Sequence, residues 1–427
     1  MFEASSPPAT RIQIDASAHC QLACPSCPTA SGATKAAMGA GQLDPAKFDA
    51  LLADNPELLE VELSNYGEMF LNPRLAEILK AAHERDVVVH ADNGVNLNHV
   101  SDGVLEAVVR YRVRSMTVSI DGATPESYAK YRVRGDFKRV IVNIRRLNQY
   151  KQQFKTVFPM LSWQFIVFGH NELEIAAARR LAGKLGMSFS PKVSWDDDVS
   201  PVRNKELVRI QTGLSATREE HHRKTGAAYL RPICHQLWHS PVVNWDGRIM
   251  GCCRNFWGEF GGNAFQDGLA ASLESPALRQ AKQMLMGRDE PAPGIPCTTC
   301  DLFLTMRKDG NWITEKELAS TAMQTATVAG VIEAGDTRAT HADVCVAPPG
   351  VDPRLPGKST PPVRYLIGTG QVLAFQLLPG REYTLHIAPQ RASRVLPAVA
   401  ISLAVKKRPI VKEFRIVLGD RASYKVA

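Results

Sequence analysis

Nine cysteines occur in the 427 residues of this chain, and the first three lie close together. Cys20, Cys24 and Cys27 have the spacing C-x3-C-x2-C. Three thiolates in one loop can hold three irons of a [4Fe–4S] cluster, which leaves the fourth iron open to a substrate or cosubstrate. An open coordination position is typical of a catalytic site. A zinc site completed by His19 or by a distant cysteine is the alternative that the spacing leaves open.

A second group of cysteines lies in the latter half of the chain. Twelve residues separate Cys234 from Gly247, and four more separate Gly247 from Cys252. Cys297 and Cys300 follow as a C-x2-C pair. Four thiolates can complete the ligation of a [4Fe–4S] cluster, with a zinc ribbon as the alternative.

Two cysteines remain outside these groups. Cys253 follows directly on Cys252 and has three interpretations: a substitute ligand, a buried thiol without a role, or a hydrogen donor to a substrate radical. Buried cysteine is common, which favours the second interpretation. Cys345 has no partner and is expected to be inert. Because the cysteines cluster, we expect no disulfide framework.

The elements that would position the first cysteine loop alternate between two periodicities. Short apolar runs are typical of buried strands, and apolar residues at three- and four-residue steps are typical of amphipathic helices. Asp44-Pro45 is a helix N-cap followed by proline at the first helical position. The predicted strands are Arg11–Asp15, Leu58–Ser64, Val87–His90, Ser115–Ile120, Leu161–Phe168 and Met187–Val193. The predicted helices are Asp44–Ala53, Pro73–Arg85, Asp102–Tyr111, Asp136–Lys151 and Glu172–Leu185.

Strands separated by helices predict an α/β fold with a parallel sheet and right-handed crossovers. Six such units can form a partial (β/α)6 TIM barrel, whose working face lies at the carboxyl ends of the strands. A flat doubly wound sheet would have the same pattern. The first cysteine loop leaves the first predicted strand at that face. Asp92 and Asp121, at two other strand ends, are candidate catalytic residues together with Cys253.

Composition divides the chain into five parts. We expect a disordered N-terminus without a signal peptide over residues 1–10, the barrel over 11–200 and a polar connector over 201–230. The Cys- and Trp-rich residues 231–310 predict a small metal-organised domain. Residues 315–427 start with a weakly helical segment and then predict a small antiparallel β unit, the C-terminal domain, of unknown role. Without an apolar run long enough for a bilayer, we expect a cytoplasmic protein.

With its cysteine loop after the first strand, the chain resembles the radical S-adenosylmethionine (SAM) superfamily. The resemblance implies a [4Fe–4S] cluster on Cys20, Cys24 and Cys27, with SAM bound on the open iron through its amine and carboxylate. It also implies transfer of an electron from the cluster and cleavage of SAM to a 5′-deoxyadenosyl radical. The residue before the third cysteine is usually aromatic in the family, whereas here it is Ser26.

Other strand ends match the same family. Asn65-Tyr66-Gly67-Glu68 is similar to the family's Gly-Gly-Glu motif, with tyrosine for the first glycine, and Asp92-Asn93-Gly94 is similar to Thr-Asn-Gly. The residues that the resemblance implies for SAM binding are Tyr66, Gly67, Glu68, Asn93, Ser119 and Arg132. A plain turn, an Asx turn at Asn93 and a surface arginine are the alternatives. Asp121 can equally cap the helix that follows it.

The segment that starts at Cys234 resembles the SPASM or twitch extension of radical SAM enzymes, whose opening signature is Cys-x9–15-Gly-x4-Cys. This resemblance implies one auxiliary [4Fe–4S] cluster. Its expected ligands are Cys234, Cys252, Cys297 and Cys300. A full SPASM domain has further cysteines after the C-x2-C pair, and only Cys345 follows here, so the shortened form is expected.

The expected activity is hydrogen abstraction from a small polar metabolite or glycan precursor, leading to oxidation or epimerisation. A flavodoxin or ferredoxin would supply the electron. A radical SAM maturase of peptides or proteins is one alternative, and a non-enzymatic iron–sulfur electron carrier is another. The net charge of +8 permits an anionic substrate, but no dense basic block indicates nucleic-acid binding. No membrane partner is expected.

Overall fold

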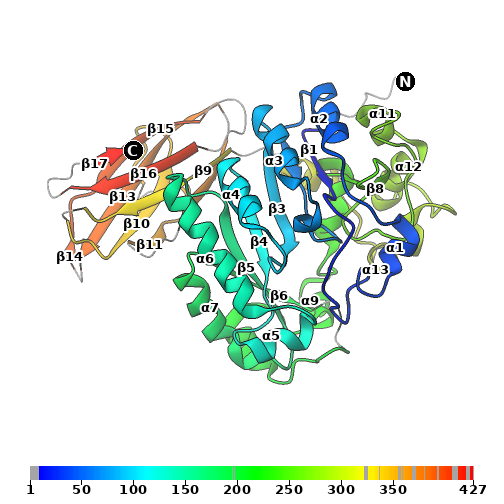
Figure 1. Cartoon of the computed structure of the whole chain (residues 1–427), viewed down its shortest axis with the longest axis horizontal. Helices are drawn as coiled ribbons and strands as arrows, with labels where there is room; N and C mark the ends of the chain where they lie inside the picture. Colours follow the sequence, from blue (N-terminus) through cyan, green and yellow to red (C-terminus); the bar gives the residue numbers. More distant parts are fainter. Residues whose placement is uncertain are drawn as a thin grey trace.

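The computed structural model combines one large mixed sheet with a smaller β-sandwich (Figure 1). The predicted disorder of residues 1–10 falls, apart from the last two of them, outside the described part of the chain. None of the described helices is both long and apolar enough to cross a membrane. The structure describes residues 9–194, 196, 198–321, 326–335, 337–353, 357, 359–367, 372–378, 380–391, 394–405, 412–419 and 424–426.

Six parallel strands form the barrel in the order β6-β5-β4-β3-β2-β1. Their bounds are β1 Arg11–Ile14, β2 Glu60–Glu62, β3 Val88–Val95, β4 Ser115–Ser119, β5 Met160–Val167 and β6 Ser188–Val193. The predicted partial barrel is therefore confirmed. The third strand is longer than predicted, because β3 continues past His90 through an irregularity between Ala91 and Val95.

Helices pack on the outer face of this sheet (Figure 1). Their bounds are α2 Pro45–Asp54, α3 Leu75–Glu84, α4 Asp102–Arg110, α5 Pro125–Tyr131, α6 Phe137–Gln153 and α7 Ile175–Lys184. The short helix α1 (Ala33–Met38) lies away from this face, and its Met38 packs on Val242 and Met250. All five predicted helices are present. As predicted, Asp44 caps α2, and its carboxylate accepts a hydrogen bond from the N–H of Ala46 at 2.7 Å. The short helix α1 was not predicted, and for α5 only a helix after Asp121, without bounds, was expected.

Alternation along the strands gives the barrel sheet one apolar and one polar face, because successive strand side chains point to opposite sides. Residues such as Ile12, Val61 and Val118 face the helices and belong to the main core. In-register partners across the strands keep the other face polar. We call this the polar face; it comprises Gln13, Glu62, His90, Ser115, Thr117, Ser119, Gln164, Ser190 and Lys192.

The cysteine-rich segment continues the barrel sheet. β7 (Val242–Val243) pairs in parallel with β1, and β8 (Ile249–Gly251) pairs antiparallel with β7. The same hydrophobic core contains residues of the barrel and of this segment, such as Ile14 and Phe303. The remaining elements are α8 Lys205–Thr212, α9 Arg218–Thr225, η3 Arg231–His235, α10 Gln236–His239, α11 Leu269–Leu273, α12 Pro276–Leu285, η4 Pro296–Thr299 and α13 Asp301–Asp309. The predicted connector thus contains two helices, α8 and α9.

After α14 (Glu315–Thr321), the chain forms a β-sandwich with its own core. One sheet has the order β11-β10-β13-β14 with β15 beside β13, and the other has the order β12-β9-β16-β17. The bounds are β9 Ala326–Glu333, β10 His341–Ala347, β11 Val363–Leu366, β12 Leu373–Leu377, β13 Glu382–Arg391, β14 Arg394–Val395, β15 Val399–Ala404, β16 Lys412–Leu418 and β17 Tyr424–Val426. The expected antiparallel pairing holds except between β16 and β9, which run parallel.

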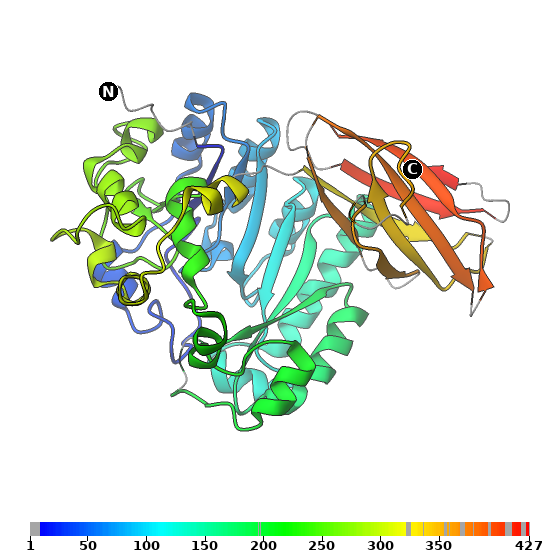
Figure 2. The same ribbon diagram turned by 180° about the vertical axis from the view of Figure 1, so that it is seen from behind.

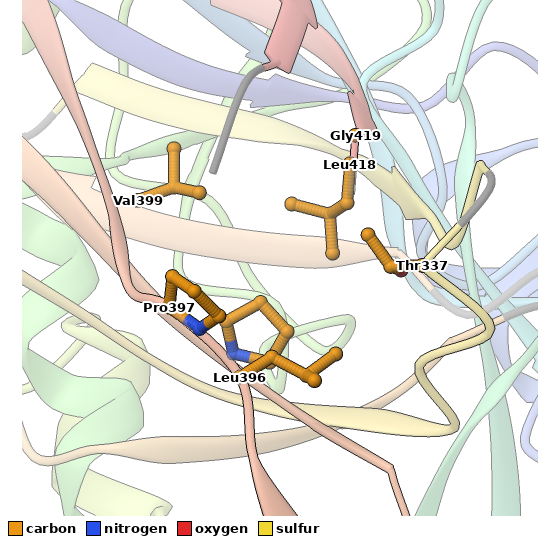
Figure 3. Close-up of a pocket in the computed structure, with 7 residues that line it drawn as sticks. Thr337, Leu396, Pro397, Val399, Leu418 and Gly419 are labelled. Carbon is orange, nitrogen blue, oxygen red and sulfur yellow. The ribbon is translucent and has the colours of Figure 1, made fainter. Parts of the chain in front are cut away.

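Two hollows of the described part of the structure lie away from the cysteines. Figure 3 shows the first, between the sandwich sheets beside Leu396, Val399 and Leu418; its volume of about 30 Å³ has room for little more than a water molecule. The second, of about 320 Å³, lies at α8 and α9 beside Arg209 and Glu220, which pair with each other.

The sandwich docks where β4 and β5 begin (Figure 2). The carboxylate of Glu413, in β16, accepts hydrogen bonds from Thr156 Oγ1 at 2.7 Å and from the N–H of Val157. Arg114, directly before β4, donates to Gln376 of β12 at 3.2 Å. These contacts lie at the amino ends of the barrel strands, so the sandwich is at the opposite end from the first cysteine loop.

Candidate functional site

The first cysteine loop leaves β1 at the carboxyl end of the sheet. Cys24 is buried, whereas Cys20 and Cys27 are half-buried. All three pack against a small apolar cluster that includes Tyr131 and Phe168. The loop is tied to the segment after α5 by a hydrogen bond from the N–H of Ala23 to the carbonyl of Val133. Residues from the ends of β1 and β5 and from α5 therefore surround the three thiols.

The three thiols are close enough to influence one another. Burial is the main cause that raises the pKa of Cys20, to about 12, and the charges of Cys24 and Cys27 add to it. Burial also raises the pKa of Cys24, while the positive charge of Arg132 opposes that shift. A positively charged ligand, such as iron, would favour the thiolate forms that burial disfavours.

Arg132 is held against Cys24 by a buried carboxylate. Its guanidinium donates to Asp121 at 2.6 Å and lies 3.8 Å from Cys24 Sγ. Asp121 is fully buried, and its other oxygen accepts the N–H of Ile166 at 2.7 Å. Both carboxylate oxygens are thus occupied, so Asp121 positions Arg132 rather than facing the barrel interior. Nor does Asp121 cap α5, since Thr124 is the N-cap and accepts from the N–H of Ser127.

The motif Asn65-Tyr66-Gly67-Glu68 lies directly beside the first loop. A side chain at Gly67 would bring its Cβ within 1.7 Å of the carbonyl oxygen of Ser17, so only glycine permits this approach. Glu68 is buried, and its carboxylate accepts the N–H of Asn96 at 2.6 Å and of Phe70 at 3.3 Å. Burial raises the pKa of Glu68 to about 7. The N–H of Glu68 donates to the carbonyl of His19 at 2.7 Å, which ties this motif to the first cysteine loop.

Tyr66 connects the first loop to the second cysteine region. Its carbonyl accepts from Thr29 Oγ1 at 2.7 Å, and its hydroxyl donates to the carbonyl of Arg254. Its ring meets that of Phe256 edge-on at 5.5 Å. The family resemblance implies a SAM contact for Tyr66, and this bridge to the second cysteine region was not predicted. The available signal was an aromatic residue where the similar family motif has glycine.

The two other predicted SAM contacts lie on the polar side of the sheet. Asn93 Nδ2 donates to Gln13 Oε1 at 2.9 Å and to the carbonyl of Ser64 at 2.7 Å, which links β3 to β1 and to the segment after β2. Ser119 accepts from Gln164 Nε2 at 3.3 Å. Close by, Asn65 Nδ2 is buried and has no acceptor among the described residues. It is a free donor beside the first cysteine loop.

The second group of thiols is assembled from three segments. Cys234 lies in η3, Cys252 directly follows β8, and the pair Cys297 and Cys300 flanks the turn before α13. Burial raises the pKa of Cys297 well above its usual value, and the charges of the other three cysteines add to this shift. Burial likewise raises the pKa of Cys252 to about 12. The structure therefore brings the four predicted auxiliary ligands together.

Cys253 faces a different environment from its neighbour. Its N–H donates to Gln236 Oε1 at 2.8 Å, and the charges of Glu62 and Lys192 on the polar face act on its thiol. Burial raises its pKa to about 11. The charges of Cys253, Asp92 and Asp121 act in turn on the ammonium group of Lys192. Successive side chains diverge here, so Cys252 joins the other auxiliary thiols and Cys253 faces the barrel.

Asp92 lies within β3 and not after its end, because the strand continues past His90 to Val95; the predicted strand-end position is therefore wrong. Its carboxylate accepts from Ser115 Oγ at 2.7 Å and lies 3.4 Å from His90 Nδ1. Cys345 is far from both groups in the chain and is buried in β10 of the sandwich.

The chemistry of the donors fits iron–sulfur clusters. All nine cysteines are free thiols, and thiolate is the ligand that such clusters use. Among the described side chains, no three His, Cys, Asp or Glu residues converge on a point that a single metal ion would occupy. A cube requires less convergence, because each thiolate binds a different iron. The unpaired Asn65 donor and the guanidinium beside Cys24 could accommodate a polar, anionic cosubstrate.

Comparison with known proteins bears out the fold. No family model and no curated protein matches the chain. SuiB from Streptococcus suis, bound to S-adenosylmethionine, is 13% identical, with a TM-score of 0.50 over 69% of this chain and 71% of SuiB. Its complex with the precursor peptide SuiA gives 12% and 0.49 over 69% and 70%. BtrN, in complex with AdoMet and 2-DOIA, gives 13% and 0.41 over 69% and 94%. The fold is that of radical SAM enzymes, as the sequence resemblance implied.

Proposed function

We propose, from the radical SAM fold and its three-cysteine loop, that this chain is a radical SAM enzyme with one auxiliary [4Fe–4S] cluster. The observation that carries the proposal is the position of Arg132. A guanidinium held 3.8 Å from Cys24 by a buried carboxylate suits an anionic group bound beside the loop. A purely electron-carrying cluster would have no use for such a group.

Each part of the site then has a role. Cys20, Cys24 and Cys27 hold the first cluster, and Arg132 orients the carboxylate of SAM. Asn65, Asn93 and Ser119 offer further polar contacts to SAM. When bound, the cluster and SAM supply a 5′-deoxyadenosyl radical that removes hydrogen from an unactivated carbon. The auxiliary cluster would be held by Cys234, Cys252, Cys297 and Cys300.

The polar face supports a small polar metabolite or glycan precursor as the substrate. Carboxyl, hydroxyl, amide and ammonium groups line the barrel side of the sheet, and Cys253 and Lys192 lie on the same side. The reaction would be an oxidation or an epimerisation, and a flavodoxin or ferredoxin would supply the electron in the cytoplasm.

A peptide substrate is the second candidate. Among the described strands of its sheet, β11 is an outer one and its Val363 is exposed, so a peptide strand could lie beside it. The sandwich lies at the amino ends of the barrel strands, which would make it a recognition site remote from the chemistry.

Anaerobic reconstitution tests the proposal. We expect roughly eight irons per chain, as two four-iron clusters require. A strong reductant and SAM should then give 5′-deoxyadenosine, and a Cys345→Ala control should behave like the parent protein. Zinc in place of iron, or intact SAM after reduction of a loaded cluster, would refute the assignment and favour a scaffold or electron carrier.

A further inference from the structure

Two buried carboxyl groups lie beside each other where β1 and β2 end. The register pairs Gln13 with Glu62, so Asp15 lies two residues further along the same side of the sheet. Asp15 and Glu62 are each 2% exposed. Burial raises the pKa of Asp15 to about 7, and the charge of Glu62 contributes to the shift. No step of the proposed function uses this pair.

The two carboxyl groups differ in their hydrogen bonds. Glu62 Oε1 accepts from the N–H and Oγ of Ser64 at 2.9 and 2.6 Å, and its Oε2 accepts the N–H of Asp92 at 2.8 Å. Neither oxygen of Asp15 has a partner in the described part of the chain. The N–H of Tyr66 approaches this carboxyl without completing a hydrogen bond. A buried acceptor without a donor destabilises the fold, so its retention calls for an explanation.

The residues near the two carboxyl groups lie on the side of the sheet that faces the barrel interior. Tyr66 experiences the charges of both Asp15 and Cys253, and Cys253 experiences that of Glu62. The lysine on this side, Lys192, acts on Cys253, Asp92 and Asp121 instead. Among the described residues no cation is paired with Asp15 or Glu62. The pair thus forms an acidic position between the first cysteine loop and Cys253.

We propose that Asp15, supported by Glu62, binds a protonated nitrogen of the substrate, so that the substrate is an amine. A cationic nitrogen supplies both the N–H donors and the positive charge that the unpaired carboxyl lacks. The inference rests on the proposed function, because that function makes this side of the sheet the substrate site. The amine of SAM has the same chemistry, and the experiment separates the two sources.

The test uses the reconstituted protein and ethylammonium chloride, with potassium chloride at equal ionic strength as the reference. Ethylammonium should raise the unfolding temperature in a saturable manner, as a ligand of the folded state does. Asp15→Asn should weaken this binding at least fivefold, and Glu62→Gln should weaken it less. Asp54→Asn, which changes an exposed carboxyl at the end of α2, should bind as the parent does. The affinity of Asp15→Asn for SAM should be unchanged.

Several results would overturn the inference. These are the absence of a saturable response in the parent protein, an undiminished response in both Asp15→Asn and Glu62→Gln, and loss of SAM affinity in Asp15→Asn, which would assign the pair to the amine of SAM. If Asp15→Asn fails to fold, Glu62→Gln decides. Failure of the proposed function would show separately, as uncleaved SAM in a protein that still binds ethylammonium through Asp15.

Discussion

The two cysteine groups differ in how the chain assembles them and in what lies beside them. Three thiols come from one loop, and a guanidinium held by buried Asp121 contacts one of them. Four thiols come from three segments, and their mutual charges combine with burial to raise the pKa of Cys297. The three-thiol loop therefore has a positively charged side chain, Arg132, next to it, and this side chain could contact a further ligand. In the four-thiol group, the thiols act mainly on one another, which suits a cluster whose four irons all have a protein ligand.

The strongest way to break this comparison is to remove one thiol from each group. Cys24→Ala should abolish 5′-deoxyadenosine formation while about four irons per chain remain. Cys297→Ala should also lose about four irons, yet it should still cleave SAM at a rate within about tenfold of the parent. Iron analysis and chromatography of the SAM products measure both. Equal loss of SAM cleavage in the two variants would show that the groups do not act separately.

The neighbours Cys252 and Cys253 test which cysteine belongs to the four-thiol group. Cys252→Ala should lose the auxiliary cluster and about four irons, because Cys252 interacts with Cys300 and Cys297. Cys253→Ala should retain the full iron content, since the thiol of Cys253 lies under the charges of Glu62 and Lys192 on the polar face. Iron counting and the visible absorption spectrum distinguish them. The reverse result would make Cys253 the ligand.

The role of the positive charge beside the three-cysteine loop can be tested by substituting Arg132. Arg132→Lys should weaken SAM binding by roughly tenfold or more, because lysine lacks the two-pronged donor geometry. Asp121→Asn should act in the same direction by releasing the guanidinium. Arg134→Lys alters an exposed arginine two residues away and serves as the control. Equilibrium binding of SAM to the iron-loaded variants gives the answer. Unchanged affinity in Arg132→Lys would remove Arg132 from the site.

The bridge between the groups predicts a smaller effect. Tyr66→Phe removes only the hydroxyl that donates to Arg254, so both clusters and SAM cleavage should be retained. Tyr66→Gly also removes the ring that packs on Phe256 and should change the magnetic interaction between the two reduced clusters more than Tyr66→Phe does. Electron paramagnetic resonance measures this interaction, with Tyr111→Phe as the control. Identical spectra in all variants would show that Tyr66 does not set the cluster arrangement.

Local patterns predicted the barrel because each of its elements has a clear period, and the N-cap Asp44 was visible for the same reason. The contacts that make the site are long-range. Arg132 meets Cys24 across 108 positions, and Tyr66 meets Arg254 across 188. Nor does any local signal reveal that β16 pairs in parallel with β9. One error was avoidable: Thr124, followed by Pro125 and Ser127, was a better cap for α5 than Asp121.

The last prediction concerns the amino ends of the strands, where a charged cluster supports the fold at the end opposite the cysteines. Burial lowers the pKa of His90, but hydrogen bonds to Asp92 and Glu60 outweigh it and raise the pKa above 6.5. Burial raises the pKa of Glu60, but the hydrogen bond with His90 and the positive charges of His90, Arg114 and Arg11 outweigh this effect. The pKa of Glu60 therefore falls to about 2. The contribution of His90 to the free energy of unfolding is therefore complete below pH 6.5 and is lost as the pH rises through the pKa of His90 in the folded protein. That of Glu60 is complete above pH 4.5 and lost toward pH 2.

Stability should thus be greatest between pH 4.5 and 6.5 as far as this cluster decides it. His90→Gln should lower the free energy of unfolding by about 2 kcal/mol at pH 6, as for a buried charge-assisted hydrogen bond, and by less at pH 9. Urea unfolding at both values measures this difference. His99→Gln, at an exposed histidine, should leave the pH dependence unchanged. If His90→Gln shows the same loss at pH 6 and pH 9, the charge on His90 does not contribute, and only its packing supports this end of the barrel.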